Sequence, residues 1–246
     1  NARLLGRIRS ARGPVPILIE HGTVHDLSPI APTVAHWLEE GPFELADAKV
    51  MGDVETTSLD VLSPIDLQCV KGTGVTFIAS MLERVVEERA RGDAQAVASL
   101  RTLLEQQIGG ALTSVVPGSD GAAEVKAALL REGLWSQYLE VAIGPDAELF
   151  TKAAVLSTVG CGADVGIRSD SHWNNPEPEM VLVVDSRGEI RGATLGNDVN
   201  LRDFEGRSAL LLGKAKDNRG ACALGPFIRL FDADFTLDDV RSAGIE

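Results

Sequence analysis

The chain has 246 residues, of which 44% are hydrophobic and 24% charged, the composition of an ordinary globular protein. Its formal net charge of −13 disfavours binding to nucleic acids and to anionic membrane surfaces. Apolar runs such as residues 180–184 are far too short to cross a bilayer. Three cysteines lack the spacing of a disulfide framework or a zinc finger, suit the reducing cytoplasm, and are predicted to be small buried side chains: Cys69, Cys161 and Cys222.

The N-terminal part of the chain predicts a small β-containing domain over residues 1–50. Apolar residues on both sides of a Gly-containing turn predict a hairpin over residues 15–27. A polar, turn-rich linker follows, so we assign residues 51–246 to a second, larger domain. The chain starts with Asn1 instead of Met and stops shortly after a helix-like segment. We therefore expect the C-terminal end of the larger domain to be incomplete.

The remaining elements are predicted from the periodicity of apolar residues. Steps of three and four residues favour helices in three segments of the middle of the chain. Two later apolar runs flank a Gly-containing turn and predict a second hairpin, and a short strand follows them. The expected helices cover residues 76–91, 94–108 and 122–132, and the expected strands cover 180–184, 189–195 and 228–231. Because most strands follow the helices instead of alternating with them, the pattern predicts the α+β class.

Two glutamates, Glu177 and Glu179, stand at alternate positions directly before the second hairpin. Side chains at i and i+2 of an extended chain share a face, and close carboxylates repel each other unless a proton or a cation lies between them. The hairpin returns Asp198 to the same end, and the apolar run 180–184 predicts burial, where acids need a partner. Three oxygen ligands that leave room for water and substrate suit Mg²⁺ or Mn²⁺. The alternative is three solvated charges at strand ends.

Several short motifs in the second half of the chain, taken together and in this order, resemble the fumarylacetoacetate hydrolase superfamily. A Phe-x-Lys strand at residues 150–152 comes first. The others are Glu177-Pro178-Glu179, the Asn-Asp-Val-Asn-Leu-Arg-Asp run at 197–203, the Gly-Lys-Ala-Lys-Asp run at 213–217, and Leu224-Gly225-Pro226. Within the superfamily, the branch of 2-keto-3-deoxypentonate dehydratases is most similar in sequence to residues 174–179, 192–203 and 213–218.

The resemblance implies a mixed β-sheet roll, a homodimer or higher homo-oligomer, and a small keto acid as substrate. It assigns three acidic side chains as ligands of Mg²⁺, or alternatively Mn²⁺ or Ca²⁺: Glu177, Glu179 and Asp198. It also places Lys152, Arg202 and Lys214 around the bound keto acid. We expect Arg202 to bind substrate and the two lysines to share proton transfer. From the residues alone, all three would be interpreted as ordinary surface cations.

The chain departs from the hydrolases of this superfamily at two positions. Those hydrolases carry a Gly-x-Asn-Tyr-x-x-His-x-x-Glu segment whose histidine and glutamate activate water. Residues 74–83 correspond to it, with Glu83 retained and Ser80 in place of the histidine. A hydroxyl is no general base near pH 7, so hydrolysis is disfavoured and Ser80 becomes a candidate substrate-binding residue. Glu205 stands where the hydrolases often have glutamine, and it either accepts a hydrogen bond from a substrate hydroxyl or is a solvent-exposed acid.

We therefore predict a metal-dependent hydro-lyase of pentose catabolism that converts a 2-keto-3-deoxypentonate into a 2,5-dioxo acid. Glu83 is the predicted base at C3 and the acid for the C4 hydroxyl, with Lys214 or Lys152 sharing the proton transfer. His172 is a rival base. The alternatives are a hydrolase that cleaves a carbon–carbon bond of a 2,4-diketo acid, and a non-catalytic protein that keeps the fold and binds a metal or a ligand.

Overall fold

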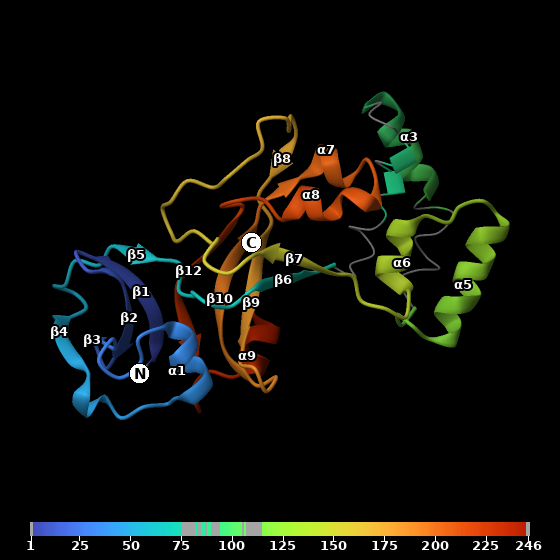
Figure 1. Ribbon diagram of the computed structural model, residues 1–246. Coiled ribbons are helices and arrows are strands. Elements are labelled where there is room, and N and C mark those ends of the chain that lie inside the picture. Colours follow the sequence, from blue (N-terminus) through green and yellow to red (C-terminus); the bar gives the residue numbers. More distant parts are fainter. Residues whose placement is uncertain are drawn as a thin grey trace. The chain divides into compact units, whose positions relative to one another are not determined.

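The computed structural model describes residues 2–74, 94–104 and 115–244, together with residues 82, 85, 86, 88, 89 and 106 (Figure 1). The chain forms two compact units. The first unit consists of Asn1–Val70, Thr151–Leu201 and Lys214–Glu246, and the second of Lys71–Phe150 and Arg202–Gly213. Among the described residues, no helix is both long and apolar enough to span a membrane.

The first unit contains an antiparallel sheet of eight strands. Along the sheet the order is β4 (Lys49–Asp53), β3 (Thr23–Asp26), β2 (Gly13–Glu20), β1 (Leu4–Ser10), β12 (Cys222–Leu230), β10 (Ile190–Asp198) and β9 (Pro178–Val184), and β5 (Val61–Leu62) pairs with β1. β8 (Asn174–Asn175) pairs with β11 (Asn200–Leu201). β6 (Val70–Thr73) pairs with β7 (Leu149–Ala153), and of these two strands only Val70 and residues 151–153 belong to the first unit. The helical elements of this unit are α1 (Val34–Glu40), η1 (Leu45–Asp47), α8 (Leu212–Lys216), of which residues 214–216 belong to this unit, and α9 (Leu237–Ser242).

Both predicted hairpins are present, and each has a turn that its sequence favours. His21 and Gly22 join β2 to β3 with positive φ angles of 52° and 80°, as a tight hairpin turn requires. β9 and β10 are joined by a turn in which Gly188 has φ 86°. In that turn one oxygen of Asp185 accepts hydrogen bonds from the backbone N–H groups of Arg187 at 2.9 Å and Glu189 at 3.0 Å. These local bonds anchor the β9–β10 hairpin, which carries the acidic residues.

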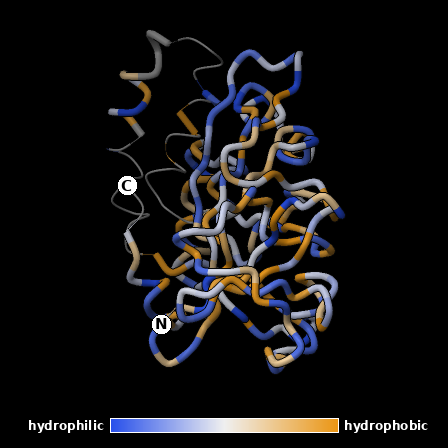
Figure 2. The backbone as a smooth tube through the Cα atoms, turned by 90° about the vertical axis from the view of Figure 1, so that its left-hand side faces the viewer, coloured by the Kyte–Doolittle hydropathy of each residue, from blue (hydrophilic) through white to orange (hydrophobic). Residues whose placement is uncertain are grey.

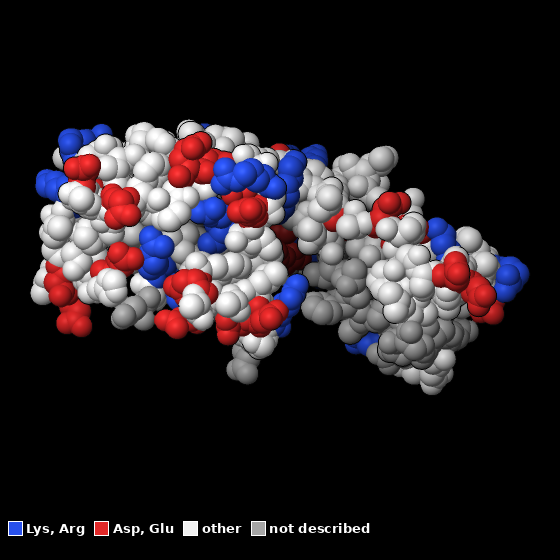
Figure 3. Space-filling model, turned by 90° about the horizontal axis from the view of Figure 1, so that it is seen from below, with Lys and Arg blue, Asp and Glu red and all other residues white. Residues whose placement is uncertain are grey.

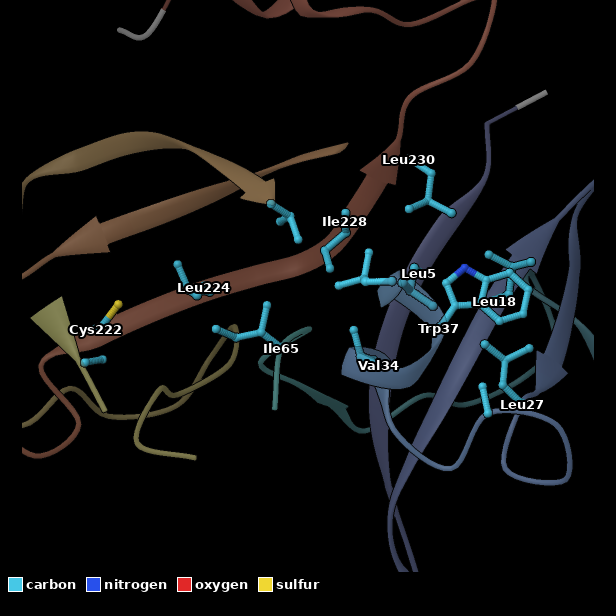
Figure 4. Packing of buried hydrophobic residues seen from close by; sticks show 14 residues of the cluster. Leu5, Leu18, Leu27, Val34, Trp37, Ile65, Cys222, Leu224, Ile228 and Leu230 are labelled. Atoms are coloured by element: carbon cyan, nitrogen blue, oxygen red, sulfur yellow. The ribbon is translucent and has the colours of Figure 1, made fainter. Parts of the chain in front are cut away.

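The core of the first unit lies between the sheet and α1. Trp37 of α1 packs with Leu5, Leu18 and Leu27, and the same cluster continues through Leu224, Ile228 and Leu230 of β12 (Figure 4). All of these side chains are at most 7% exposed. Burial of so many apolar groups on β12 explains why this strand lies inside the sheet, next to β10. The core therefore holds β12 in place, and β10 of the acidic hairpin pairs with this strand.

The strands of residues 1–50 share their sheet with strands from the other end of the chain. Leu4 of β1 lies opposite Arg229 of β12. Glu39 of α1 accepts hydrogen bonds from the backbone N–H and the hydroxyl of Ser186, at 2.9 and 2.6 Å. The separate N-terminal domain over residues 1–50 stays a prediction, and the observed compact unit joins these residues to two later segments.

Figure 2 colours the backbone by hydropathy, and hydrophobic and hydrophilic stretches are mixed along the chain. In β9, Val183 is buried, whereas Leu182 and Val184 are 40% and 44% exposed. The burial predicted for the whole run 180–184 is therefore correct for one face of the strand only, because successive side chains of a strand point to opposite faces.

The second unit is helical. It contains α3 (Ala94–Leu104), α5 (Asp120–Arg131), α6 (Gln137–Ile143), α7 (Arg202–Glu205) and η3 (Ala209–Leu211). Ser119 and Ser136 cap α5 and α6, because their hydroxyls accept hydrogen bonds from Ala122 N and Tyr138 N. The core of this unit consists of Leu82, Val85, Val86, Ala122, Leu129, Leu139, Ala142 and Ile143.

The helices predicted over 94–108 and 122–132 correspond to α3 and α5. Of the helix predicted over 76–91, the described residues 82, 85, 86, 88 and 89 are helical, and the others lie outside the described residues. Helices and antiparallel strands together confirm the predicted α+β class. On the face in Figure 3, acidic and basic side chains of the described residues are interspersed, so the negative net charge does not gather into one patch there.

Candidate metal centre

The register of the β9–β10 hairpin brings the predicted acidic residues to one end of the sheet. Glu179 of β9 lies opposite Gly196 of β10, and Pro178 lies opposite Asn197. One step further, the N–H of Asp198 donates a hydrogen bond to the backbone carbonyl of Glu177 at 2.9 Å. This pairing places the side chain of Asp198 beside the two glutamates, as predicted from the sequence of the hairpin.

Three carboxylates converge at this end of the hairpin. One oxygen each of Glu177, Glu179 and Asp198 can be chosen so that all three lie within 4.8 Å of one another. Oxygen ligands bind Mg²⁺ or Ca²⁺ at about 2.0–2.6 Å, so two ligands of one cation lie at most about 4–5 Å apart. The separation and the all-oxygen donor set therefore fit a hard divalent cation.

Two buried lysines lie against the carboxylates. Lys216, at the end of α8, contacts Glu177 Oε2 and lies 2.9 Å from Asp198 Oδ2. Lys152 of β7 lies 2.7 Å from Asp198 Oδ1. The side chains of these lysines are only 3% and 2% exposed. Three carboxylates thus face two ammonium groups, which leaves one negative charge when all five are ionised, and a divalent cation is attracted to that excess.

Amide groups hold Glu177 in place. Asn200 Nδ2 donates a hydrogen bond to Glu177 Oε1 at 3.0 Å, and Asn197 Oδ1 accepts one from the backbone N–H of Glu177 at 3.0 Å. Asn200 itself is completely buried in β11, opposite Asn175 of β8. The side chain of Glu177 is therefore fixed on one oxygen by an amide and on the other by the ammonium group of Lys216.

Glu179 has a different environment, although it belongs to the same cluster. Burial raises its pKa, and the negative charges of Asp198 and Glu177 raise it further, against the opposing effect of Lys216 and Lys152. A cation between these carboxylates would lower that pKa again, because it favours the ionised form. The electrostatics of Glu179 therefore match a metal-binding cluster that gains from the added positive charge.

The structure distinguishes the two lysines of the 213–217 motif. Lys214, which was predicted to transfer protons, is exposed, whereas Lys216 is buried among the carboxylates. Lys216 and Asn200 were not predicted as site residues, although they lie inside the motifs at 213–217 and 197–203. The available signal was the second lysine of the Gly-Lys-Ala-Lys-Asp run, but whether it is buried depends on how α8 packs.

Two predicted substrate-binding residues belong to the second unit. Arg202 Nη1 lies 3.4 Å from Glu205 Oε2, within α7, and Tyr138 donates a hydrogen bond to the backbone carbonyl of Glu205 at 2.9 Å. Glu205 is only 4% exposed, so its interpretation as a solvent-exposed acid is wrong.

The other predicted candidates have different outcomes. Ser80 and Glu83 lie outside the described residues. His172, the rival base, is exposed. Cys222 is buried as predicted and faces Asp198 across β10 and β12, but Cys69 and Cys161 are exposed, which corrects the prediction that all three are buried.

Two curated relatives match part of the chain. A 2-dehydro-3-deoxy-D-arabinonate dehydratase of Saccharolobus solfataricus is 41% identical over 105 residues, which cover 40% of this chain and 35% of the relative. A probable 2-keto-3-deoxyxylonate dehydratase of Haloferax volcanii is 43% identical over 91 residues, 37% of this chain and 31% of the relative. The matched stretches thus span about a third of the length of these relatives. No family model matches the chain.

Solved structures match most of the chain. One, of a 2-keto-3-deoxy-D-arabinonate dehydratase complexed with magnesium and 2,5-dioxopentanoate, has a TM-score of 0.60 at 24% identity and covers 94% of this chain and 66% of its own. A fumarylacetoacetate hydrolase from Exiguobacterium antarcticum has a TM-score of 0.54 at 16% identity, with 94% and 68% covered. The resemblance predicted from the sequence is therefore confirmed: the chain has the fold of the fumarylacetoacetate hydrolase superfamily and is similar in sequence to its 2-keto-3-deoxypentonate dehydratase branch.

Proposed function

We propose that the chain is a metal-dependent hydro-lyase that removes water from a 2-keto-3-deoxypentonate to give a 2,5-dioxo acid. The observation that carries the proposal is the convergence of Glu177, Glu179 and Asp198 within 4.8 Å at the end of a hairpin. Sequence similarity to two dehydratases of 2-keto-3-deoxy sugar acids supports the reaction class. The magnesium ion in the similar dehydratase structure supports Mg²⁺ as the cation, with Mn²⁺ and Ca²⁺ as alternatives.

The three carboxylates would hold the cation, which as a Lewis acid would polarise the substrate's keto group and so acidify the proton on C3. Lys216 and Asn200 hold Glu177 so that its charge stays directed into the cluster. Lys216 also holds Asp198. A fixed set of ligands needs no rearrangement when the substrate arrives, which is how preorganised sites lower a reaction barrier.

The dehydration itself requires one group that accepts a proton and later returns it. We assign this role to Glu83: its carboxylate takes the proton from C3, the C–H electron pair forms the C3–C4 double bond, and the C4–O bond breaks. The same carboxyl group protonates the departing hydroxyl, which leaves as water. The exposed Lys214 is the second candidate for this transfer. The resulting 5-hydroxy-2-keto-3-enoate is an isomer of the 2,5-dioxo acid. It reaches that product when C5 and its hydroxyl each lose a proton and C3 and C4 each gain one, with no oxidant required.

Substrate recognition is assigned to three polar side chains outside the acidic cluster. Arg202 provides a cation for the substrate carboxylate, and Glu205 and Ser80 provide acceptors for hydroxyl groups.

We further propose that the protein acts in the cytoplasm as a homodimer or higher homo-oligomer. Three cysteines outside disulfides, two of them exposed, suit a reducing compartment.

The test is a mass-spectrometric assay of the purified chain with a panel of 2-keto-3-deoxypentonates and Mg²⁺. We expect a product lighter than its substrate by one water, and we expect EDTA to abolish it. Glu179→Gln should abolish it as well, because an amide is a neutral and weaker ligand. The matched control is Glu189→Gln, since Glu189 lies on the turn of the same hairpin with 68% of its side chain exposed.

Two other results would overturn the proposal. Fragments released from a 2,4-diketo acid, with no dehydration of any sugar acid, would indicate a carbon–carbon hydrolase. Metal binding that Glu179→Gln abolishes, in a chain that turns over no keto acid, would indicate a non-catalytic binding protein. Loss of the product in both glutamine variants would mean that the assay reports folding instead of the site.

A further inference from the structure

Lys152 is held in a way that separates it from an ordinary substrate-binding lysine. Its side chain is 2% exposed, and its Nζ donates hydrogen bonds to the backbone carbonyls of Val199 at 2.8 Å and Lys216 at 2.7 Å. Its third neighbour is Asp198 Oδ1, at 2.7 Å. The three oxygens come from the junction of β10 and β11, from the end of α8, and from the acidic cluster.

These contacts surround the ammonium group with two hydrogen-bond acceptors and one ion-pair partner. A lysine ammonium has three N–H donors and no acceptor. Two donors go to backbone carbonyls, and the third has Asp198 within ion-pair distance. An ammonium buried to this degree needs such partners, because an unpaired charge in the protein interior is costly. Two N–H groups of Lys152 are therefore committed to backbone carbonyls, and a contact with substrate would compete with the ion pair to Asp198.

The geometry also gives Lys152 an indirect hold on the second lysine. The carbonyl that it binds belongs to Lys216, whose own Nζ contacts Glu177 Oε2 and Asp198 Oδ2. One buried ammonium therefore fixes Asp198 directly and fixes the backbone of the residue that bridges Asp198 to Glu177. Through these contacts it acts on two of the three carboxylates.

We infer that Lys152 is a positioning residue that sets the orientation of Asp198 and Lys216 for metal binding, and not the proton-transfer group that the sequence suggested. The inference rests on the proposed metal site. It predicts that a variant without this ammonium binds the metal more weakly, although it has one positive charge less. A purely electrostatic role predicts the opposite sign, because a cation beside the ligands repels a divalent metal.

The experiment compares Lys152→Met and Lys152→Arg with the unaltered chain by calorimetric titration with Mn²⁺ and with Mg²⁺. Arginine keeps the charge, and methionine keeps a similar volume without it. We expect both variants to bind the metal at least about tenfold more weakly, as is typical when a group that orients a metal ligand is lost. Unchanged or tighter binding by Lys152→Met would overturn the inference. Tighter binding by Lys152→Met together with unchanged binding by Lys152→Arg would assign a charge role only.

A double-mutant cycle tests whether the effect passes through Asp198. In an Asp198→Asn background, the further change Lys152→Met should weaken metal binding much less than it does in the unaltered chain. Equal losses in both backgrounds would contradict the proposed route. Circular dichroism and thermal unfolding without metal identify any variant that does not fold.

Amine labelling tests the inference without any substitution. In reductive methylation of the unaltered chain, followed by peptide mass spectrometry, we expect Lys214 to be modified and Lys152 to stay unmodified, with or without metal. Equal labelling of the two lysines would overturn the inference. If the unaltered chain bound no divalent metal, the proposed function would fail, while the labelling result would still report whether Lys152 is held as described.

Discussion

The β10 end and the α7 turn both carry predicted site residues, yet their side chains are held very differently. Asp198 of β10 has two buried lysines within 2.9 Å and is 7% exposed. Arg202 of α7 has a 3.4 Å contact to Glu205, three residues along the same short helix. In the first region ion pairs between residues far apart in the sequence hold the carboxylate, whereas the ion pair between Arg202 and Glu205 is local to one turn of helix. A local pair of this kind contributes only about 0.2–0.5 kcal/mol to an isolated helix.

The largest expected effect is a loss of metal binding when the cluster at the end of β10 is changed. Asp198→Asn should weaken Mn²⁺ binding by more than about 100-fold, because loss of a group that merely supports a ligand already costs about 10–100-fold. Arg202→Gln should leave Mn²⁺ binding unchanged. Calorimetric titration of both folded variants checks the pair. An equal loss in both would mean that the two regions contribute alike to metal binding.

The two lysines of α8, Lys214 and Lys216, should differ in their contributions to the stability of the fold. Lys216→Met leaves Glu177 and Asp198 without the ammonium that joins them and should lower the free energy of unfolding by about 3 kcal/mol in metal-free buffer. The exposed Lys214→Met should change it by no more than about 0.5 kcal/mol. Urea unfolding measures both. Added Mg²⁺ should restore part of the loss, since a ligand that binds only the folded state stabilises it.

A smaller effect is expected in the second region. Tyr138→Phe removes the hydroxyl that donates to the backbone carbonyl of Glu205 and should cost about 1 kcal/mol of stability. Metal binding should not change, because the removed bond lies within the second unit. Thermal unfolding and Mn²⁺ titration of this variant together check the prediction. A change in Mn²⁺ affinity as large as that of Asp198→Asn would contradict it.

The acidic cluster could be predicted from sequence because strand pairing is regular. Alternate positions share a face, and a short turn fixes which residues of the two strands are opposite. Glu177, Glu179 and Asp198 therefore follow from one hairpin and its register. The motif similarity selected the same residues independently, so two different signals agreed on them.

Lys216 could not be selected in the same way. On a helix, residues two positions apart point in directions about 160° apart, so of Lys214 and Lys216 only one can face the cluster. The sequence of the 213–217 run contains both lysines and does not say which face of α8 is buried. That choice depends on the packing of α8 against strands distant in sequence. The burial of Glu205 is decided in the same way, by neighbours such as Tyr138 that lie far along the chain.

The pairing of β1 with β12 also could not be predicted from local sequence patterns. Leu4 and Arg229 are opposite in the sheet although nearly the whole chain separates them. Hairpin rules apply only to strands joined by a short turn. The hairpin over residues 15–27 was therefore predicted correctly, while its place in a larger sheet was not.

The smallest expected effect concerns Cys222 of β12, which is buried opposite Asp198, in contrast to the exposed Cys69 and Cys161. Burial raises the pKa of the Cys222 thiol to about 11, and Asp198 and Glu179 contribute in the same direction against Lys152. At pH 8 iodoacetamide should alkylate Cys69 and Cys161 and leave Cys222 unmodified, because the thiolate is the reactive form. Peptide mass spectrometry checks this.

The same shift predicts a pH dependence of stability with a definite sign. An unfolded thiol ionises near its ordinary pKa of about 8.5, whereas the folded one stays protonated to about pH 11. The unfolded state therefore loses its proton first, and the free energy of unfolding should fall as the pH rises from about 9 to about 11. Below pH 8 this thiol should contribute no pH dependence. Because lysines and tyrosine also titrate in this range, the measurement is the difference between the unaltered chain and Cys222→Ala in urea unfolding. A difference that stays constant from pH 8 to 11 would mean that Cys222 ionises as easily in the folded protein as in the unfolded chain, and that this part of the sheet excludes water less than its burial indicates.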